Sequence, residues 1–518
     1  MRKSSNPDFM HAKRLGAIYT PDAVATWLML EVEALGFVPE VVLDPAAGDG
    51  ALLEAALEIF PMATLRAADV DPTAWSGLRA KGYVVGAKAN DALGKSAWFD
   101  PRSHIATLVY SNPPWGADMG TNSRLDYRNR FELARGQFDT FDLFVEKTIR
   151  DLPDGGWAAL FIPDSVLLPQ HQATRQYVLE NARIHKIVRL PEGTFPNASI
   201  GSVAIVLEKG AASPDFEVVC SRISRQEMKL YDTNPRKLFH CSASKSHRVR
   251  QSSWMSDIKA NWIIDISKTE RHVIEALRSA QKSTSELVWD RWFESGRGLE
   301  LGKKSVHLVR EFGLEKASEY VPVAVGEDLH RRSVNPSRFV SRFETGIRFK
   351  DEFSTDRRLL VRKTGIGIKA AVSSGIVTTQ TIYHFRPNAD APEYALDFVA
   401  GFLASRVTVA LQLAKSGEIE WRSHPYVTQK SIKEIPIRVP FSDSEEESLA
   451  RRLAMISRHL HESPQDLELE LESDVLVAQL LGGREELVDW APKFLRAVTG
   501  CSYAQYLSNL TTPKALVA

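Results

Sequence analysis

Apolar residues in the first two hundred positions change repeatedly between two spacings, and this pattern predicts strands separated by helices. Short, largely apolar runs predict strands at 41–45, 64–71, 105–112, 157–163, 185–190 and 202–209. Runs with apolar positions three and four apart predict helices at 51–60, 140–152 and 171–182. Strands joined by helices of this length form βαβ units, so the expected fold is α/β and Rossmann-like, with a mostly parallel sheet.

The second half of the chain has a different pattern and predicts further domains. From about residue 290 the runs become short and strand-like, and 442–462 has an acidic start followed by helical spacing. We expect a mixed α+β domain followed by a helical C-terminal region, with a poorly informative bridge before them. The expected division is 1–215, 216–289, 290–440 and 441–518.

Composition and charge narrow the class of protein. The 518 residues carry 65 Lys and Arg against 65 Asp and Glu, so any basic surface must be local. Cys220, Cys241 and Cys501 are too far apart for a disulfide framework or a zinc site, and no metal site is expected. With no signal peptide at the N-terminus and no 18-residue apolar run, we expect a protein of the bacterial or archaeal cytoplasm, with no membrane partner.

A glycine-containing turn follows the first predicted strand. The stretch "LDPAAGDG" ends the strand in Asp44 and Pro45 and places Gly48 and Gly50 before the next helix. Glycine permits tight backbone geometry and lets a ligand approach the N–H groups. Ligands of parallel sheets bind at the carboxyl ends of strands. This turn is therefore a candidate ligand site, with an ordinary βα turn as the alternative.

Acidic residues after the next two strands suit a nucleoside-like ligand. Asp69 lies about 20 residues after the glycine turn, where a carboxylate can accept hydrogen bonds from ribose hydroxyls. Asp91 could accept from an adenine amino group or only shape a turn. For Asp71 a helix cap is the preferred interpretation.

The stretch "SNPPWG" after the strand at 105–112 predicts the chemistry. The side-chain carbonyl of Asn112 and a neighbouring backbone carbonyl can both accept hydrogen bonds from one NH₂ group. Pro113 and Pro114 stiffen the turn, and Trp115 offers a face for stacking. Such a turn holds an amino group ready to attack an electrophile.

These two stretches together resemble the amino-methyltransferases that use S-adenosylmethionine. The Asn-Pro-Pro-aromatic turn is shared by N6-adenine DNA methyltransferases, some ribosomal RNA methyltransferases and glutamine N5-methyltransferases. The segment 15–35 is similar to the motif that precedes the sheet in N6-adenine DNA methyltransferases, in the order of the gamma (TaqI-like) type. By that likeness Tyr19, Thr20 and Pro21 lie over the cofactor.

The resemblance covers about residues 15 to 210 and implies a mechanism. A flipped adenine would lie between Trp115 and Phe195, although core packing is the alternative for Phe195. Residues 394–440 resemble the end of a TaqI-like target recognition domain. The implied function is site-specific methylation of adenine N6 in duplex DNA by base flipping, within a restriction-modification or phage-defence system with a possible cognate endonuclease.

A local excess of basic residues predicts where DNA binds. Between Arg331 and Lys369 there are eleven Lys and Arg against four Asp and Glu. This stripe suits phosphate contact, although a solvated loop region is the alternative. The candidate DNA-binding residues are Arg357, Arg358, Arg362, Lys363 and Lys369.

Other interpretations stay open at this stage. The Arg-rich insert at 117–138 is either a mobile loop or a solvated surface. RNA or protein glutamine are alternative substrates, and a DNA-binding subunit that has lost catalysis is an alternative role. A type I modification subunit is expected to have a helical domain before the cofactor motif, so that organisation is disfavoured. A nuclease metal site at 214–229 is attributed to chance.

Overall fold

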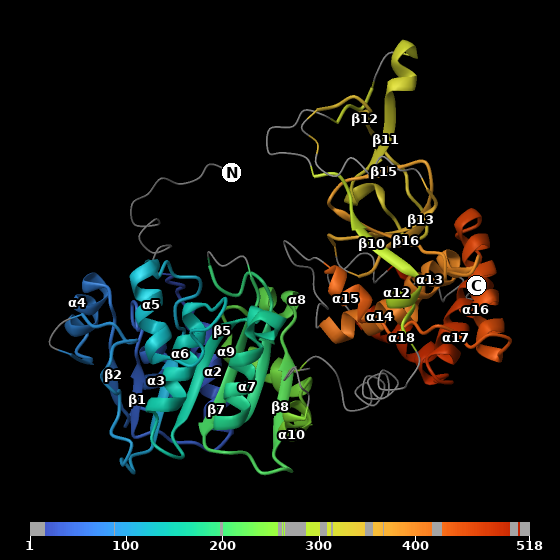
Figure 1. Ribbon diagram of the computed structural model, residues 1–518. Helices are drawn as coiled ribbons and strands as arrows, with labels where there is room; N and C mark the ends of the chain where they lie inside the picture. Colours follow the sequence, from blue (N-terminus) through green and yellow to red (C-terminus); the bar gives the residue numbers. More distant parts are fainter. Residues whose placement is uncertain are drawn as a thin grey trace. The chain divides into compact units, whose positions relative to one another are not determined.

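The chain divides into two compact units, Met1–Lys268 and Thr269–Ala518 (Figure 1). The computed structural model describes residues 16–86, 89–196, 200–256, 262, 264, 286–300, 308–311, 314–345, 347, 356–365, 367–416, 427–497 and 506–507. The predicted acceptors and stacking rings lie in the first unit, and the predicted DNA-binding residues lie in the second.

The first unit is built on one sheet with the strand order β3-β2-β1-β4-β5-β7-β6-β8-β9 (Figure 1). The strands are β1 (Val41–Asp44), β2 (Thr64–Ala67), β3 (Val84–Val85), β4 (Thr107–Ser111), β5 (Trp157–Pro163), β6 (Ala182–Leu190), β7 (Ser202–Lys209), β8 (Glu217–Arg222) and β9 (His247–Arg250). Strands β1 to β5 pair in parallel, and β7 runs antiparallel between β5 and β6. The predicted α/β fold with a mostly parallel sheet is confirmed.

Helices connect these strands and cover the sheet. Their bounds are α2 (Asp22–Ala34), α3 (Ala51–Ile59), α4 (Pro72–Ala80), α5 (Gly120–Arg130), α6 (Thr140–Asp151), α7 (Gln172–Asn181), α8 (Arg225–Tyr231), α9 (Pro235–Ser244) and α10 (Gln251–Met255). Helix α2 packs against α3 and α9, whereas α7 packs against α6 and α10. Every residue of β4 and β5 is buried, as expected for central strands covered on both faces.

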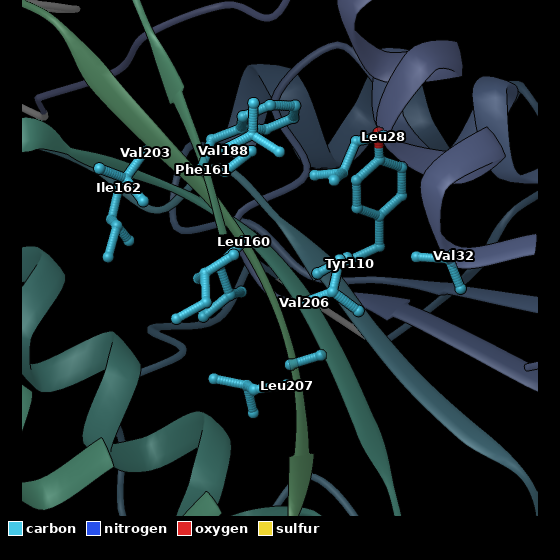
Figure 2. Packing of buried hydrophobic residues seen from close by; sticks show 14 of the residues in the cluster. Leu28, Val32, Tyr110, Leu160, Phe161, Ile162, Val188, Val203, Val206 and Leu207 are labelled. Carbon is cyan, nitrogen blue, oxygen red and sulfur yellow. The ribbon is translucent and has the colours of Figure 1, made fainter. Parts of the chain in front are cut away.

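The core of the first unit fixes the strand that carries the Asn-Pro-Pro-Trp turn. Figure 2 shows Tyr110 of β4 pointing toward Leu28 and Val32 of α2. Its hydroxyl donates to the backbone oxygen of Ala25 at 2.5 Å, so the ring ties strand to helix. The end of β4, where the Asn-Pro-Pro-Trp turn leaves the sheet, is therefore held against α2.

The first unit extends beyond the domain boundary predicted at residue 215, because it includes strands β8 and β9. Strand β8 pairs in parallel with β6, and β9 pairs with β8, so both extend the same sheet. Residues 216–250 are therefore part of the first unit rather than a bridge. Their short, mixed runs did not reveal this, because pairing to β6 depends on an edge that forms only in the folded sheet.

The second unit combines two small sheets with helices. One sheet has the order β10-β16-β13-β14 and the other β12-β11-β15 (Figure 1). Their strands are β10 (Phe293–Arg297), β11 (Tyr320–Ala324), β12 (Arg338–Ser341), β13 (Arg358–Arg362), β14 (Ala370–Ser373), β15 (Val377–Thr378) and β16 (Ile382–Pro387). This agrees with the predicted mixed α+β region.

The C-terminal region is helical as predicted, but it is not peripheral. The helices of this unit are α12 (Val288–Arg291), α13 (Ala395–Ala404), α14 (Arg406–Ser416), α15 (Gln429–Lys433), α16 (Glu445–Glu462), α17 (Leu467–Leu480) and α18 (Glu486–Ala497). Helix α16 packs on α13 and α18 on α14, with Leu453, Leu460 and Leu495 fully buried. Residues 441–497 thus complete the core of the second unit.

Among the described residues no single helix is long and apolar enough to cross a bilayer. Only α13 and α14 taken together meet that length and composition, and they are bent by 60°.

Candidate active site

The glycine turn lies where the carboxyl ends of β1, β2 and β4 meet. Asp44, the last residue of β1, is buried and accepts hydrogen bonds from Ala46 N at 3.0 Å and Ser111 Oγ at 2.8 Å. Burial raises the pKa of Asp44 to about 7. Gly48 and Gly50 have φ of +53° and +93°, which favour glycine, and Gly50 begins α3. The turn therefore has the backbone geometry that the sequence predicts.

Asp69 is held in place by two backbone donors. Gly48 N donates to Asp69 Oδ2 and Asp71 N donates to Asp69 Oδ1, both at 2.8 Å. Burial raises the pKa of Asp69, while these bonds oppose the rise. Each carboxylate oxygen keeps a lone pair, so the group can still accept from a ligand hydroxyl. Asp71 caps α4 by accepting from Thr73 N at 2.8 Å, which confirms its preferred interpretation.

Asp91 is partly used in shaping its own loop. Its Oδ1 accepts from Leu93 N at 2.9 Å, and its carboxylate also hydrogen-bonds the Tyr127 hydroxyl. Burial, then the charge of Asp91, raises the pKa of Tyr127. The turn-shaping role is thus present, and a role toward an adenine amino group stays a prediction.

The segment before α2 covers the glycine turn. Tyr19 is 50% exposed, and its ring lies close enough that a Cβ added to Gly48 would be 3.7 Å from Tyr19 Cε1. Burial and then the charges of Asp49, Asp71 and Asp69 raise the pKa of the Tyr19 hydroxyl. Pro21 precedes the first turn of α2. The ring and the glycine backbone therefore border a narrow space that any side chain at Gly48 would enter.

The same segment holds the Asn-Pro-Pro-Trp turn. Asn112 is 8% exposed, and its Nδ2 donates to Ile18 O at 2.9 Å and to Thr20 Oγ1 at 3.1 Å. Trp115 N donates to Gly16 O at 3.1 Å, and a Cβ at Gly16 would lie 2.7 Å from Trp115 O. Both amide protons of Asn112 are used, whereas its buried Oδ1 has no hydrogen-bond partner among the described residues.

Trp115 and Phe195 touch each other instead of facing across a gap. Trp115 is 6% and Phe195 2% exposed, with ring centroids 5.3 Å apart and planes at 75°. Phe195 also packs edge-on against Phe161, whose backbone oxygen accepts from Trp115 Nε1 at 3.4 Å. The observed arrangement differs from the predicted pair of facing rings. For a base to lie between the two rings, Phe195 would have to move. In this state Phe195 is a core residue.

Four residues that the sequence did not single out complete the turn. Ser111 joins it to Asp44, and Gly16 and Ile18 supply backbone acceptors. Asp139 also belongs here, because its Oδ1 accepts from Gly116 N at 2.7 Å and its side chain caps α6. The Asp-Thr-Phe-Asp start of α6 signalled a cap, but nothing in the sequence showed that it also binds Gly116 N.

The insert at 117–138 is partly solvated and partly packed, which differs from both predicted alternatives, a mobile loop and a solvated surface. Helix α5 is solvated, with no buried residue, but the end of the insert packs into a small apolar cluster. Phe131, Ala134 and Phe138 join Ala92 and Leu93 there. The insert is therefore anchored beside the loop that carries Asp91.

Several arginines of the basic stripe form ion pairs or hydrogen bonds within the second unit. Arg331 and Arg332 both bind Glu470, and Arg357 Nη2 binds Asp397 at 2.6 Å. Arg358 is 1% exposed, and its Nη2 donates to Ile376 O at 2.8 Å. The prediction that Arg358 contacts DNA is corrected, since its side chain is buried. Arg357 is ion-paired but exposed, so for it DNA contact stays a prediction.

The remaining candidates of the stripe are better placed. Arg362, Lys363 and Lys369 are partly exposed at the end of β13 and in the loop that leads to β14. For them DNA contact stays a prediction. No group of His, Cys, Asp and Glu that could hold a metal occurs among the described residues.

Comparisons with known proteins match this geometry. A model of the family described as N-6 DNA Methylase matches residues 80–260. The type I restriction enzyme EcoEI methylase subunit of Escherichia coli is 28% identical over 228 residues, 39% of this chain and 44% of the relative. The type II methyltransferase M.XamI of Xanthomonas campestris pv. amaranthicola is 32% identical over 126 residues, 23% of this chain and 24% of the relative. The matches span less than half the length of these relatives.

Solved structures resemble the fold over both units. The type IIL restriction-modification enzyme MmeI, solved with DNA, has a TM-score of 0.54 at 10% identity, covering 97% of this chain and 77% of the other. The type ISP enzyme LlaBIII, solved bound to DNA, has a TM-score of 0.51 at 11% identity, covering 89% and 39%. Both type I and type II methylases are among the sequence relatives, so the family match supports neither organisation over the other.

Proposed function

Because residues 80–260 carry a domain of the N-6 DNA methylase family, we propose that this chain methylates adenine N6 at specific sites in duplex DNA. The first unit performs the transfer from S-adenosylmethionine, and the second unit contacts the DNA. The target adenine leaves the helix to reach the first unit, since its amino group is inaccessible inside the stacked duplex. A restriction-modification or defence role, with a possible endonuclease partner, is part of this proposal.

The observation that supports this proposal most is the orientation of the Asn112 amide. Its Nδ2 has two acceptors in the segment 16–20, so its Oδ1 must point away from them. A buried acceptor without a donor costs free energy, on the order of 1–3 kcal/mol. An incoming NH₂ group supplies the missing donor. The amide is thereby prepared to accept from a donor such as an amine, and it disfavours a group that can only accept, such as a carbonyl or an ether oxygen.

The residues around the glycine turn fit S-adenosylmethionine. Gly48 leaves open the space under Tyr19, and Asp69 is fixed with acceptor capacity free for ribose hydroxyls. When bound, the cofactor supplies an electrophilic methyl group on a sulfonium. Asp44 and Ser111 brace the turn against the end of β4, which sets the distance between cofactor and amine.

The chain's own contribution to the transfer is positioning and hydrogen bonding. Asn112 Oδ1 accepts a hydrogen bond from the adenine amine, which directs the nitrogen lone pair toward the methyl carbon. The amine of adenine is too weakly basic to need deprotonation before attack, so its proton leaves after the new C–N bond forms. No strong general base is therefore required next to Asn112.

The test is Asn112→Ala with a nucleoside digest. The purified chain should place N6-methyladenine in duplex DNA, measured by mass spectrometry. Asn112→Ala should lower turnover by about 10²–10³, comparable to the loss of one preorganised polar contact. Its affinity for S-adenosylmethionine, measured by calorimetry, should stay within about twofold of wild type.

Two results would contradict the proposal. N4-methylcytosine or methylated glutamine without methyladenine would change the substrate but keep the role of the turn. A wild-type chain that does not bind S-adenosylmethionine would support a DNA-binding subunit without catalysis.

A further inference from the structure

A cavity of about 350 Å³ opens in the second unit, where the ends of its two small sheets meet. Four segments bring polar side chains to it: the turn after β11, the start of β12, the end of β13 and the loop before β16. The lining residues are Leu299, Leu308, Val325, Gly326, Glu327, Arg338, Arg362, Thr364, Thr379, Gln380 and Thr381.

Arg362 differs from the other basic residues of its stripe. Arg331, Arg332 and Arg357 are ion-paired with Glu470 or Asp397. Arg362 has no ion pair within 4 Å among the described residues, and its Nε is buried without a hydrogen-bond partner. Burial lowers the pKa of its guanidinium, with Glu327 as the opposing charge.

A guanidinium that is partly desolvated but unpaired raises the free energy of the free protein. A ligand that supplies hydrogen-bond acceptors removes this cost, so an unpaired guanidinium favours ligand binding. The neighbours of Arg362 are themselves satisfied: Gly326 N donates to Thr381 Oγ1 at 2.9 Å, and Thr379 and Thr381 share a hydrogen bond of 2.8 Å. These hydrogen bonds hold that side of the cavity in place, whereas Arg362 Nε lacks a partner among the described residues.

The donors and acceptors at this cavity match the edge of a base pair. Arg362 offers a planar fork for two acceptors, as guanine presents with O6 and N7 in the major groove. Glu327 and Gln380 are exposed at the rim and can pair with an amino group next to those acceptors. Leu308 and Val325 add an apolar wall that suits a methyl or the face of a base.

We propose that this cavity reads one base pair of the DNA target, with Arg362 as the specificity-determining donor to a guanine. The proposal rests on the function proposed above and adds which residue selects the sequence. A phosphate would offer Arg362 the same acceptor chemistry, and the experiment separates the two sources.

The experiment compares wild type, Arg362→Ala, Arg362→Lys and the control Arg496→Ala, an exposed arginine on α18. Each purified variant methylates a DNA library, and sequencing that detects modified adenine reads the methylated contexts. Affinity for the wild-type target is measured across a range of salt concentrations. Calorimetric binding of S-adenosylmethionine and thermal unfolding report whether each variant is folded.

Base reading predicts a change at one position of the target. Arg362→Ala should relax the preference for guanine there by about 5- to 150-fold. Arg362→Lys should not restore it, because an ammonium lacks the planar fork. Arg496→Ala should match wild type. If Arg362→Ala does not fold, Arg362→Lys alone carries the test, with the same expected loss of discrimination.

Other outcomes overturn the proposal. Equal weakening on all sequences, with the salt slope reduced by about 1 and rescue by Arg362→Lys, would show a phosphate contact. Unchanged context and affinity would show that DNA does not enter the cavity. A wild-type chain that methylates no DNA would instead refute the proposed function itself, and this inference with it.

Discussion

The two units use similar polar residues in opposite ways. In the first unit, Asn112 and Asp69 stand at strand ends, and each is held by backbone groups with an acceptor left over. In the second unit, three of the arginines in the basic stripe, Arg331, Arg332 and Arg357, pair with buried carboxylates of the helices. A spaced motif at strand ends therefore gathers its residues in one place, whereas several of the charges counted along the chain are paired within the fold.

Physics explains the difference. The carboxyl ends of neighbouring parallel strands meet at one edge of a sheet, so a motif at a strand end predicts where its residues gather. A charge, in contrast, is paired by whatever the fold places beside it, often from a remote helix. Arg331 and Glu470 are 139 residues apart in the chain, and their 2.7 Å ion pair exists only after packing.

The largest expected effect tests the structural role of the second unit's arginines. Glu470→Ala would leave Arg331 and Arg332 buried without their shared carboxylate, which should cost about 3–5 kcal/mol of unfolding free energy. Urea unfolding measures it. The control Glu472→Ala removes an exposed partner of Arg452 and should cost about 0–1 kcal/mol. Equal small losses would show that the pairing of Arg331 and Arg332 with Glu470 contributes little to stability.

The next effect concerns Phe195. This residue packs in the core of the structure, whereas the sequence predicts that it contacts the extruded base. Phe195→Leu keeps an apolar side chain against Trp115, so folding and cofactor affinity should persist. If Phe195 moves to stack on the extruded adenine, turnover on duplex DNA should fall by a factor equivalent to about 1–3 kcal/mol. Steady-state methylation rates measure this. Unchanged turnover would leave Phe195 with packing alone.

A smaller effect is expected at Thr20, and it tests whether this residue positions Asn112 or contacts the cofactor. Thr20→Val removes one of two acceptors for Asn112 Nδ2, so the amide turns more freely and kcat should drop about 2- to 10-fold. KM for S-adenosylmethionine should not change, and Thr20→Ser should recover kcat. A raised KM with normal kcat would assign Thr20 to cofactor binding.

A further effect is a pH dependence of stability from Asp44. Burial raises the pKa of Asp44 from 3.8 to about 7, so the folded chain holds this proton more tightly than the unfolded chain. Its contribution is full below the unfolded pKa and is lost as the pH rises to about 7. Relative to wild type, the Tm of Asp44→Asn should therefore rise between about pH 4 and pH 8.

Exposed Asp49→Asn, in the same turn, is the control for that titration. A Tm difference between Asp44→Asn and wild type that stays constant across this range would show that Asp44 is ionised in the folded chain.

The sequence by itself determined the α/β architecture of the first unit. Strands at 157–163 and 202–209 begin and end where the pattern places them, because continuous apolar runs have no other stable location than a covered sheet. It also determined the glycine turn and the Asn112 turn, since glycine with positive φ and rigid prolines impose their geometry locally.

The tertiary structure alone decided which polar groups stay available. Gly16 O and Ile18 O reach Trp115 and Asn112 from almost a hundred residues away, and this long-range contact points Asn112 Oδ1 away from its anchors. It likewise buried Arg358 and left Arg362 unpaired in a cavity. Hydrogen bonding and desolvation depend on neighbours in space, and no pattern along the chain contains those neighbours.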